Sequence, residues 1–369
     1  MKFAALRRHF SEIEKAYLSD KKQLEPILGF KLTEKFIEFR RKFDPKKELE
    51  KLNREGITIL AVDDKDYPES LKNISDPPIC LYVKGKLLKS SEPRFSPATP
   101  PRGPLAISSK RAPELSLEIP IYFAIVGTRK PTSYGRQIAY KFARELTEAG
   151  FIIVSGMAMG IDTVAHQAAI DAGGKTIAVL GCGVNIVYPA INRNLYQNII
   201  KTGGSIISEF PPNQTVLKGL FISRNRIISG LSKGVLIAEG GEYSGSLITA
   251  KYAGIQGKDV FAVPSQISSE MSQAPNLLIK QGAKLVTTVK DIFEELDIKI
   301  TPQKKEDIRR NLNEDEKIVF DILQINPQTI DDLAVGLGKT VSEVLNTISV
   351  LEIKGVIEKN QEQKYQIRL

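Results

Sequence analysis

Four residues suited to anion binding follow a short apolar run near the middle of the chain. The run opens the segment YFAIVGTRKPTSYGRQIAYKFARELTEAG (Tyr122–Gly150), and Gly127, Thr128, Arg129 and Lys130 come directly after it. The run is typical of a buried strand, and a helical pattern begins after the cations. Glycine lets a ligand approach the backbone, and the N–H groups of a helix N-terminus favour negative charge. The segment therefore predicts an anion site, and the anion is a nucleotide cofactor, a small phosphate or the backbone of a nucleic acid.

Segments of similar character occur further along the chain and are interpreted as loops. They are SGMAMGID (155–162), GCGVNIVYP (181–189), SRNRIISG (223–230) and EGGEYSGSLITAK (239–251). Ligands of an open α/β sheet bind beyond the carboxyl ends of its strands, so we expect these segments to surround one pocket. The cations expected around it are Arg129, Lys130, Arg136, Arg224, Arg226 and Lys251. Such a pocket suits a phosphate group, and it offers no evident means of cutting one.

Short apolar runs alternate with helical patterns from Tyr122 to about Leu296. The runs are YFAIV, FIIVS, TIAVL, SIIS, VLIA, VFAV and KLV, of which the last is Lys284–Val286. Runs of this kind are typical of strands that are buried on both faces of a parallel sheet. Strict alternation of strand and helix predicts a doubly wound, Rossmann-like α/β fold with right-handed crossovers.

The flanking regions predict further units. Residues 1–55 are charged and helical in pattern, and we expect an N-terminal helical module there, before a Rossmann-like domain over 56–297. A proline-rich stretch within 89–120 cannot sustain a helix or a strand ladder, and it is interpreted as a surface insertion or linker. After a charged linker at 298–311, the pattern of a helix, a helix-turn-helix and a hairpin predicts a winged helix over 312–369.

Composition favours a basic protein of the cytoplasm. The 369 residues carry a formal net charge of +9, which makes a nucleic acid or another anionic surface a plausible partner. Two cysteines, Cys80 and Cys182, are too few for a disulfide framework and suit a reducing compartment. The first residues lack the apolar core of a signal peptide, and no apolar run reaches the roughly 18 residues of a membrane span.

Several residues have a structural interpretation beside a functional one. The glycine spacing after Tyr122 is not G-x-G-x-x-G and no acidic ribose reader follows, so a dinucleotide cofactor is not expected. His166 has no Cys/His cluster around it, and we expect a packed histidine and no metal site. Ser244 and Ser246 lack the context of a nucleophile elbow. Asn225 and Arg226 either bind the anion or brace neighbouring helices.

The motifs taken together resemble the DNA-processing protein A family, also called DprA or Smf. The resemblance covers Tyr67 to about Leu296 and rests on YPESLKNISDPPICLYVKG, IVGTRKPTSYG, SGMAMGIDTVAHQAAIDAGGKTIAVLGCGVNIVYPAINRNL, ISEFPP, RNRIISGLSKGVLIAEGGEYSGSLITAKYA, GKDVFAVP and NLLIKQGAKLV. It implies an extended Rossmann-like domain with an N-terminal helical module and a C-terminal winged helix. It also implies a non-enzymatic homodimer that binds single-stranded DNA, protects it, and loads the RecA recombinase in natural transformation.

The resemblance also implies a DNA-binding site. The positions that match the family's basic pocket are Gly127, Thr128, Arg129, Arg224, Asn225, Arg226, Ser244, Gly245, Ser246 and Lys251. By this likeness the anion is a DNA phosphate, as expected for sequence-independent binding of a single strand. Tyr134, Phe221 and Tyr243 lie near these segments and are either stacking platforms or packing residues.

The chain departs from the family pattern at several places. Met159 stands where the family usually has arginine, and Ile222–Ser223 stands where it usually has Phe-Pro. The segment SQISSEMSQAPN (265–276) has no glycine, whereas the family has a glycine-rich stretch there, so its conformation is open. The insertion within 89–120 is not part of the usual pattern.

An enzyme is the alternative hypothesis. The segment EGGEYSGSLIT is similar to the PGGxGTxxE loop of nucleoside-monophosphate phosphoribohydrolases, whose reaction needs a carboxylate after the glycines. Ile248–Thr249 stands near the corresponding place, which leaves Glu239 and Glu242 as the available acids. In the winged helix, the expected recognition helix Val341–Ile353 contains no lysine or arginine, so a protein-interaction or regulatory role is favoured over duplex binding.

Overall fold

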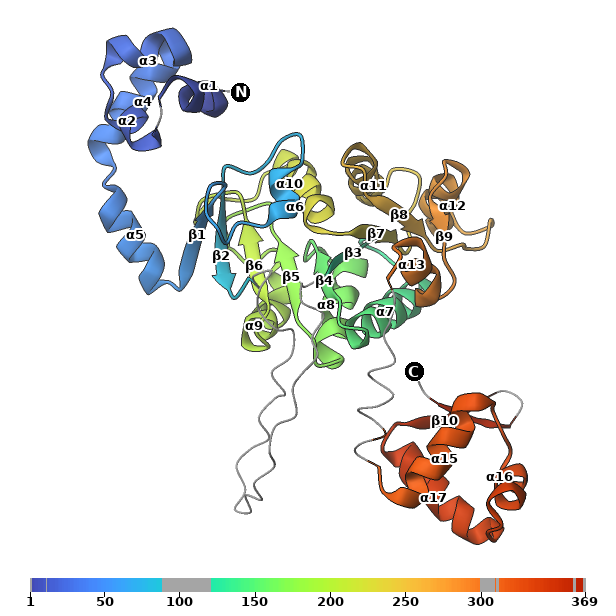
Figure 1. Cartoon of the computed structure of the whole chain (residues 1–369). Coiled ribbons are helices and arrows are strands. Elements are labelled where there is room, and N and C mark those ends of the chain that lie inside the picture. Colours follow the sequence, from blue (N-terminus) through green and yellow to red (C-terminus); the bar gives the residue numbers. More distant parts are fainter. Residues whose placement is uncertain are drawn as a thin grey trace, which may run out of the picture. The chain divides into compact units, whose positions relative to one another are not determined.

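The computed structural model describes residues 2–10, 12–87, 121–298, 309, 312–360 and 363–367. The insertion predicted over 89–120 lies outside the described residues, and so does most of the linker predicted over 298–311. The chain divides into two compact units, Met1–Leu296 and Asp297–Leu369, each described by itself (Figure 1).

A nine-stranded sheet forms the centre of the first unit within the described residues. Its strands are β1 (Ile57–Ala61), β2 (Cys80–Gly85), β3 (Tyr122–Val126), β4 (Ile152–Ser155), β5 (Thr176–Val179), β6 (Ser205–Ser208), β7 (Gly234–Ile237), β8 (Asp259–Ala262) and β9 (Lys284–Leu285). They lie in the order β1-β2-β6-β5-β4-β3-β7-β8-β9. Neighbours from β6 to β9 are parallel, whereas β2 pairs antiparallel with both β1 and β6. The predicted Rossmann-like, mostly parallel sheet is confirmed.

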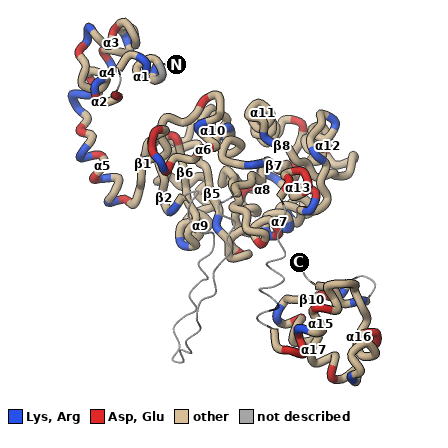
Figure 2. The backbone as a smooth tube through the Cα atoms, viewed as in Figure 1, with Lys and Arg blue, Asp and Glu red and all other residues tan. Residues whose placement is uncertain are grey.

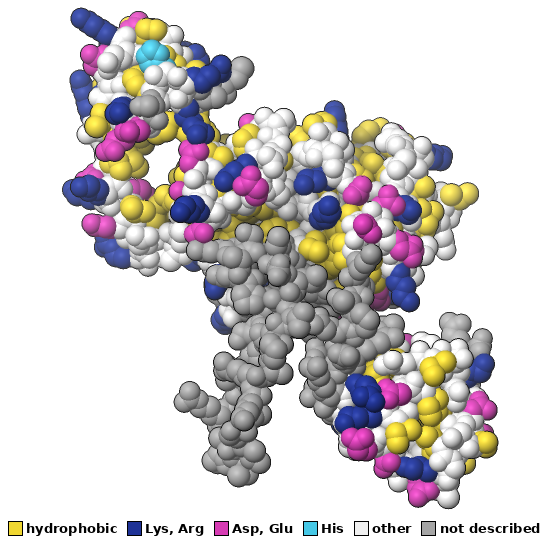
Figure 3. Space-filling view, viewed as in Figure 1, with side chains coloured by type: hydrophobic (Ala, Val, Ile, Leu, Met, Phe, Trp, Pro, Cys, Tyr) yellow, Lys and Arg dark blue, Asp and Glu magenta, His cyan; other side chains and the backbone are white. Residues whose placement is uncertain are grey.

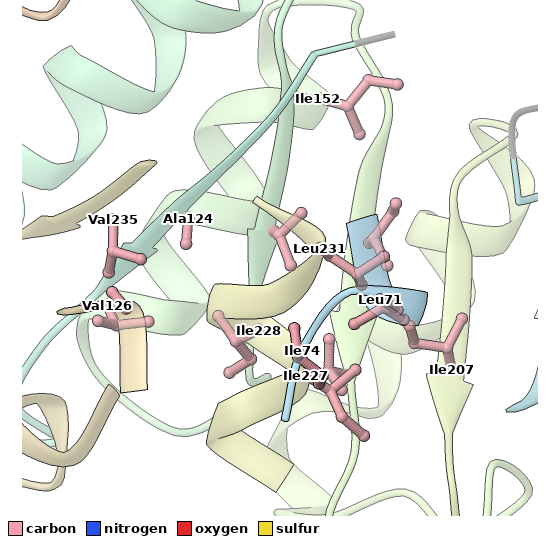
Figure 4. Close-up of a cluster of buried hydrophobic side chains, with 14 of the residues drawn as sticks. Leu71, Ile74, Ala124, Val126, Ile152, Ile207, Ile227, Ile228, Leu231 and Val235 are labelled. Carbon is pink, nitrogen blue, oxygen red and sulfur yellow. The ribbon is translucent and has the colours of Figure 1, made fainter. Parts of the chain in front are cut away.

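The helices that accompany the strands pack on both faces of the sheet. They are α6 (Glu69–Lys72), α7 (Ser133–Glu148), α8 (Ile161–Asp171), α9 (Arg193–Lys201), α10 (Lys218–Leu231), α11 (Gly245–Ile255), α12 (Gln273–Lys280) and α13 (Val289–Glu295), with 3-10 turns η1 (Ala190–Asn192) and η2 (Glu270–Ser272). On one face, Val126 of β3 shares a buried cluster with Ile227 and Ile228 of α10 (Figure 4). On the other face, the rings of Phe123 and Phe261 lie 5.6 Å apart. Alternate residues of each strand therefore fill two separate cores.

The strand order reverses at β3 and β7. From β3 the sheet continues through β4 and β5 to β6 on one side, and β7 then pairs with the opposite side of β3, with Val126 opposite Ile237. The loops after β3 and β7 consequently diverge to opposite faces of the sheet. Such a switch point is where open α/β sheets bind ligands.

Two segments interpreted as loops are helical, and one predicted buried strand is exposed. Ser223–Gly230 lies inside α10, because Ile227 and Leu231 recur at helical spacing and are buried under the sheet. The end of the segment 239–251 forms the first turns of α11, which Ser244 caps by accepting a hydrogen bond from the backbone of Ser246. Both residues of β9 are exposed because this strand lies at the edge of the sheet.

Short helices form the N-terminal part of the first unit. They are α1 (Lys2–His9), α2 (Ile13–Leu18), α3 (Lys21–Leu28), α4 (Phe30–Lys42) and α5 (Pro45–Arg54). Asp20 caps α3 and Asp44 caps α5, and the side chains of Leu24 and Leu28 are buried. Basic and acidic residues are interspersed along these helices (Figure 2). The helical module predicted at this end is present.

The second unit has the predicted winged-helix pattern. Its elements are α15 (Glu314–Ile325), α16 (Ile330–Leu337), α17 (Val341–Ile353), β10 (Ile357–Lys359) and β11 (Tyr365–Ile367). A buried cluster that includes Phe320, Leu333 and Ile348 joins the three helices. Hydrophobic side chains also gather on the surface of this unit (Figure 3), where Val335 is 85% and Ile353 is 86% exposed.

Candidate nucleic-acid interface

A pocket of about 720 Å³ opens at the switch point between β3 and β7. The predicted site residues that line it are Gly127, Thr128, Arg129, Arg224, Asn225, Ser244, Gly245 and Ser246. The segment after β3, the middle of α10 and the start of α11 therefore meet around one space, although they lie far apart in the sequence.

The remaining predicted residues lie elsewhere. Lys130 is exposed next to Arg129, and Arg136 is exposed on the second turn of α7. Lys251 is exposed on α11 and lines a different hollow, between α11 and α12. Arg226 is buried and points away from the pocket lining. None of these four cations lines the pocket, although Lys130 is adjacent in the sequence to Arg129, which does.

Arg129 supplies a cation at the exposed edge of the pocket. Its guanidinium carbon lies 5.9 Å from the centre of the Phe221 ring, and that ring lies 5.5 Å from the ring of Tyr188. The contact orients the guanidinium without neutralising it. Among the described residues no carboxylate lies within ion-pair distance of Arg129, so its charge is available to an anion that enters from solvent.

Arg224 has the opposite surroundings. It is 4% exposed, and its Nη1 donates to the backbone carbonyl of Gly156 at 2.8 Å and also to that of Val179. Burial lowers the pKa of Arg224 to about 10, and the charge of Arg129 acts in the same direction. A Cβ at Gly156 would lie 2.5 Å from the guanidinium, so a side chain here would displace Arg224 from this position. Arg224 therefore ties α10 to the ends of β4 and β5 at the floor of the pocket.

Asp162 is the acidic neighbour of this arginine. Its carboxylate accepts hydrogen bonds from the backbone N–H groups of Gly156 at 3.1 Å and Ala158 at 3.3 Å. Burial raises the pKa of Asp162, and the charge of Arg224 opposes that shift. The acid fixes the loop after β4 and offsets the buried guanidinium.

Arg226 braces the domain. Its Nη1 and Nη2 donate to the two carboxylate oxygens of Glu209 at 3.1 and 2.6 Å, and its Nε donates to Asp76 at 3.2 Å. Of the two interpretations left open for this residue, the contacts match the brace, because both partners are protein carboxylates. Asn225 lines the pocket and also makes a contact within the protein. Its Nδ2 donates to the carbonyl of Gly245 at 3.4 Å.

The start of α11 faces the pocket. Ser244, Gly245 and Ser246 all line it, Gly245 is exposed, and the two serine hydroxyls lie 2.7 Å apart. The first backbone N–H groups of a helix have no partner within the helix, and they favour an anion. Ser244 already accepts hydrogen bonds from the N–H groups of Ser246 and Leu247, so this end of α11 adds mainly the positive end of its helix dipole to the charge of Arg129.

Sequence reasoning missed one wall of the pocket. Glu270, Met271 and Gln273 line it, and Gln273 accepts a hydrogen bond from the backbone of Glu242 at 3.0 Å. These residues belong to the glycine-free segment 265–276, which forms η2 and the start of α12. The available signal was position, because this segment follows the carboxyl end of β8. Two carboxylates, Glu242 and Glu270, thus limit where a polyanion can lie.

The aromatic candidates differ in exposure. Tyr243 lines the pocket and is 92% exposed, whereas Phe221 is half-buried beneath Arg129. The hydroxyl of Tyr134 donates to the carbonyl of Pro264 at 3.0 Å. Met159, at the position where the family resemblance expects arginine, is 47% exposed. Tyr243 is the aromatic side chain with the most surface for a base.

The remaining chemical candidates are packing residues. His166 is buried, its Nδ1 lies 2.7 Å from the hydroxyl of Thr176, and burial lowers its pKa to about 3. Cys182 is buried, and burial raises its pKa to about 11. Within the described residues, no group of three His, Cys, Asp or Glu side chains could hold a metal ion, and no helix is long and apolar enough to cross a membrane.

The recognition helix of the winged-helix unit lacks the chemistry of groove binding. Helix α17 carries no lysine or arginine, and its Glu343 accepts hydrogen bonds from the backbone and the hydroxyl of Thr340 in a capping box. Lys354, which follows the helix, pairs with the buried Glu316 at 2.6 Å. The exposed side chains of α17 include Val341, with 49% of its surface accessible.

The fold and the site together define a class of protein. Its members combine a Rossmann-like sheet, which has an anion-binding pocket at its switch point, with a winged helix. The sequence profile of the DNA recombination-mediator protein A family matches residues 103–297, and that of the DprA winged helix domain matches residues 303–361. The chain belongs to the DprA/Smf family of DNA-processing proteins.

Similar proteins support this assignment. The DNA processing protein DprA of Bacillus subtilis is 40% identical over 242 residues, which is 66% of this chain and 72% of the relative. The X-ray structure of DprA from Streptococcus pneumoniae has a TM-score of 0.64 at 33% identity and covers 80% of this chain and 92% of that one. A structure of DNA processing protein A from Helicobacter pylori, described for its single-stranded DNA binding mode, has a TM-score of 0.52 at 29% identity and covers 65% and 95%.

Proposed function

We propose that this chain binds single-stranded DNA through the switch-point pocket. Arg129 is the observation that carries the proposal, because it is exposed, lines the pocket together with the N-terminus of α11, and forms no ion pair with a carboxylate of the described residues. A phosphate of the strand binds between the guanidinium and the first N–H groups of α11. Lys130 and Arg136 attract the phosphates on either side.

The predicted residues have different roles in this proposal. Gly127, Thr128, Ser244, Gly245 and Ser246 contact the strand through the backbone and hydroxyl groups. Arg224, Asn225 and Arg226 position these groups, and Lys251 contributes charge from outside the pocket. The single-stranded DNA binding described for the Helicobacter pylori relative supports this assignment.

A base stacks on an exposed aromatic side chain in this arrangement. Tyr243 offers its ring at the pocket mouth, and stacking on aromatic rings tolerates any base sequence. Backbone contacts and stacking together give binding without sequence preference, as protection of an incoming strand requires.

Family membership supports a proposal for the biological role. The chain acts in the cytoplasm as a homodimer, protects incoming single strands, and loads the RecA recombinase during natural transformation or recombination. It does so without catalysis and without a cofactor. The relatives named DNA processing protein support this role. Co-purification with RecA and the mass of the protein in solution test the two partners separately.

The enzyme alternative makes a separate prediction. Glu242 lines the pocket, whereas Glu239 is 1% exposed and accepts two hydrogen bonds from Thr132. A phosphoribohydrolase would release free bases from nucleoside monophosphates, and Glu242→Gln would abolish the release. We expect no release from the wild type.

The test of DNA binding is fluorescence anisotropy of a labelled oligothymidine across a salt series. Wild type, Arg129→Ala and Lys201→Ala are compared, since Lys201 is also exposed but lies in the last turn of α9 and outside the pocket lining. We expect Arg129→Ala to weaken binding about tenfold and to reduce the salt slope by about one. Equal losses in both variants would mean that general charge, and not this pocket, binds the strand.

A further inference from the structure

Helices α7 and α11 follow the two strands of the switch point, and their N-termini differ. The N-terminus of α11 opens to the pocket, as described above. The N-terminus of α7 is covered by a side chain that belongs to the other strand of the switch point, namely Glu239, two residues after β7. In open α/β sheets, the helix after the first strand is where a phosphate commonly binds.

The carboxylate of Glu239 is held by the residue that caps α7. Thr132 donates its backbone N–H to one carboxylate oxygen at 2.8 Å and its hydroxyl to the other at 2.5 Å. The same hydroxyl accepts a hydrogen bond from the N–H of Gly135 at 3.1 Å. The two donors of the N-cap residue thus hold a carboxylate at the end of the helix where negative charge is stabilised, and the acid is 1% exposed.

The first turn of α7 is shaped around this carboxylate. A Cβ at Gly135 would lie 2.1 Å from Oε2 of Glu239, so glycine is required for the acid to approach. The backbone carbonyl of Glu239 also accepts a hydrogen bond from Thr128 at 2.8 Å, which ties the loop after β3 to the loop after β7. No lysine or arginine of the described residues forms an ion pair with Glu239, and the acid is stabilised by the N–H and the hydroxyl of Thr132, the N-cap of α7.

We infer that Glu239 is a built-in substitute for phosphate at the N-terminus of α7, and that it excludes free phosphate and mononucleotides from this half of the switch point. The N-terminus of α11, which also lies at the pocket, carries no such acid in its first turn and remains available to a phosphate. One phosphate of a strand can bind there while its neighbours remain outside. The inference rests on the proposed function at one point only, namely that single-stranded DNA is the ligand that binds in the rest of the pocket.

The test uses inorganic phosphate as the probe and no DNA, so it can fail independently of the proposed function. Thermal unfolding of full-length wild type, Glu239→Ala and Glu239→Gln is followed in phosphate and in chloride of equal ionic strength. Glutamine is the matched control because it fills the same space and still accepts from Thr132. We expect about 20 mM phosphate to raise the Tm of Glu239→Ala by roughly 3 °C more than that of the other two proteins.

Loss of the acid also weakens the cap of α7, so Glu239→Ala can be unfolded without an added anion. In that case we expect phosphate, and not chloride, to restore its far-UV circular dichroism. Gly135→Ala adds a geometric control, since its cost in Tm should be several degrees in the wild type and much smaller in the Glu239→Ala background. Equal phosphate effects on all three proteins, or no recovery of an unfolded Glu239→Ala, would overturn the inference.

Discussion

The two walls of the switch-point pocket use the same side chain in opposite ways. Arg129 is exposed and stacked over an aromatic ring, whereas Arg224 is buried and donates to backbone carbonyls. Both line the pocket. The first has a charge available to a ligand, and the second has its donors engaged by the fold. The comparison teaches that a basic motif in a sequence can contain both a binding group and the scaffold that positions it.

Substitution of the buried arginine should have the largest effect. Arg224→Ala leaves the carbonyls of Gly156 and Val179 without this donor and Asp162 without its cationic neighbour. We expect a loss of about 3 to 5 kcal/mol in the free energy of unfolding, measured by urea denaturation at neutral pH. Arg224→Lys, which keeps a cation, should lose less. If Arg224→Ala unfolded at the same urea concentration as the wild type, Arg224 would not be part of the scaffold, and the distinction between the buried and the exposed arginine would fail.

Arg226→Ala should cost about 2 kcal/mol in the same measurement, because it leaves the half-buried Glu209 without its bidentate partner. The effect is smaller than that of Arg224→Ala since Asp76 is 80% exposed and regains water. Arg226→Ala combined with Glu209→Gln should recover part of the loss. Were Arg226→Ala fully stable but unable to bind DNA, Arg226 would be a contact residue and not a brace.

The pH dependence of stability reports on His166, a buried histidine whose pKa is also lowered by the charge of Arg224. Burial lowers the pKa of His166 to about 3, so between that pH and about 6.5 the unfolded chain binds a proton that the folded chain does not. Stability contributed by the neutral imidazole therefore falls as the pH drops through this window. We expect wild type to lose about 1 to 2 kcal/mol more than His166→Gln between pH 7 and pH 5. Parallel losses in both proteins would mean that His166 is protonated in the folded state.

Substitution of Arg129, on the exposed wall of the pocket, should change DNA binding and leave the stability of the protein nearly unchanged. Arg129→Ala should change the free energy of unfolding by less than about 0.5 kcal/mol, because the side chain makes no hydrogen bond to the described protein. Its DNA affinity should nevertheless fall as stated above. Urea denaturation and anisotropy of one preparation check both halves. A large loss of stability in Arg129→Ala would show that Arg129 has a structural role like that of Arg224.

The smallest effect is expected in the winged-helix unit. Ile353→Glu adds a negative charge to α17, a helix without lysine or arginine, at a side chain that is 86% exposed. Oligothymidine affinity should stay within about twofold of wild type, by anisotropy at low salt, since the change lies outside the proposed site. A tenfold loss would show that this unit takes part in strand binding.

The sequence predicted the sheet well for a physical reason. Runs such as Phe151–Ser155 are apolar on both faces only because helices cover both, and this pattern is local. The segment 223–230 was harder to assign, since its two arginines, its asparagine and its two serines are typical of a polar loop. It is helical because Ile227 and Ile228 pack under the sheet and because its arginines find distant partners.

Those distant partners explain why the site was only partly predictable. Asp76 lies 150 residues before Arg226, and Gly156 lies 68 residues before Arg224, so no local pattern announces either contact. The exposed Arg129 needed no such partner, and its position after a buried strand was sufficient. Glu239 appeared in the sequence as a possible catalytic acid, and only the geometry shows its contact with Thr132.

The most direct measurement of the central claim is photo-crosslinking of 5-iodouracil-substituted oligothymidine, followed by mass spectrometry of the crosslinked peptides. We expect crosslinks to the peptide that contains Tyr243, whose ring is exposed at the mouth of the pocket. These crosslinks should be lost in Arg129→Ala and kept in Lys201→Ala. Crosslinks confined to residues 2–54 or to the winged-helix unit, unchanged by Arg129→Ala, would contradict it.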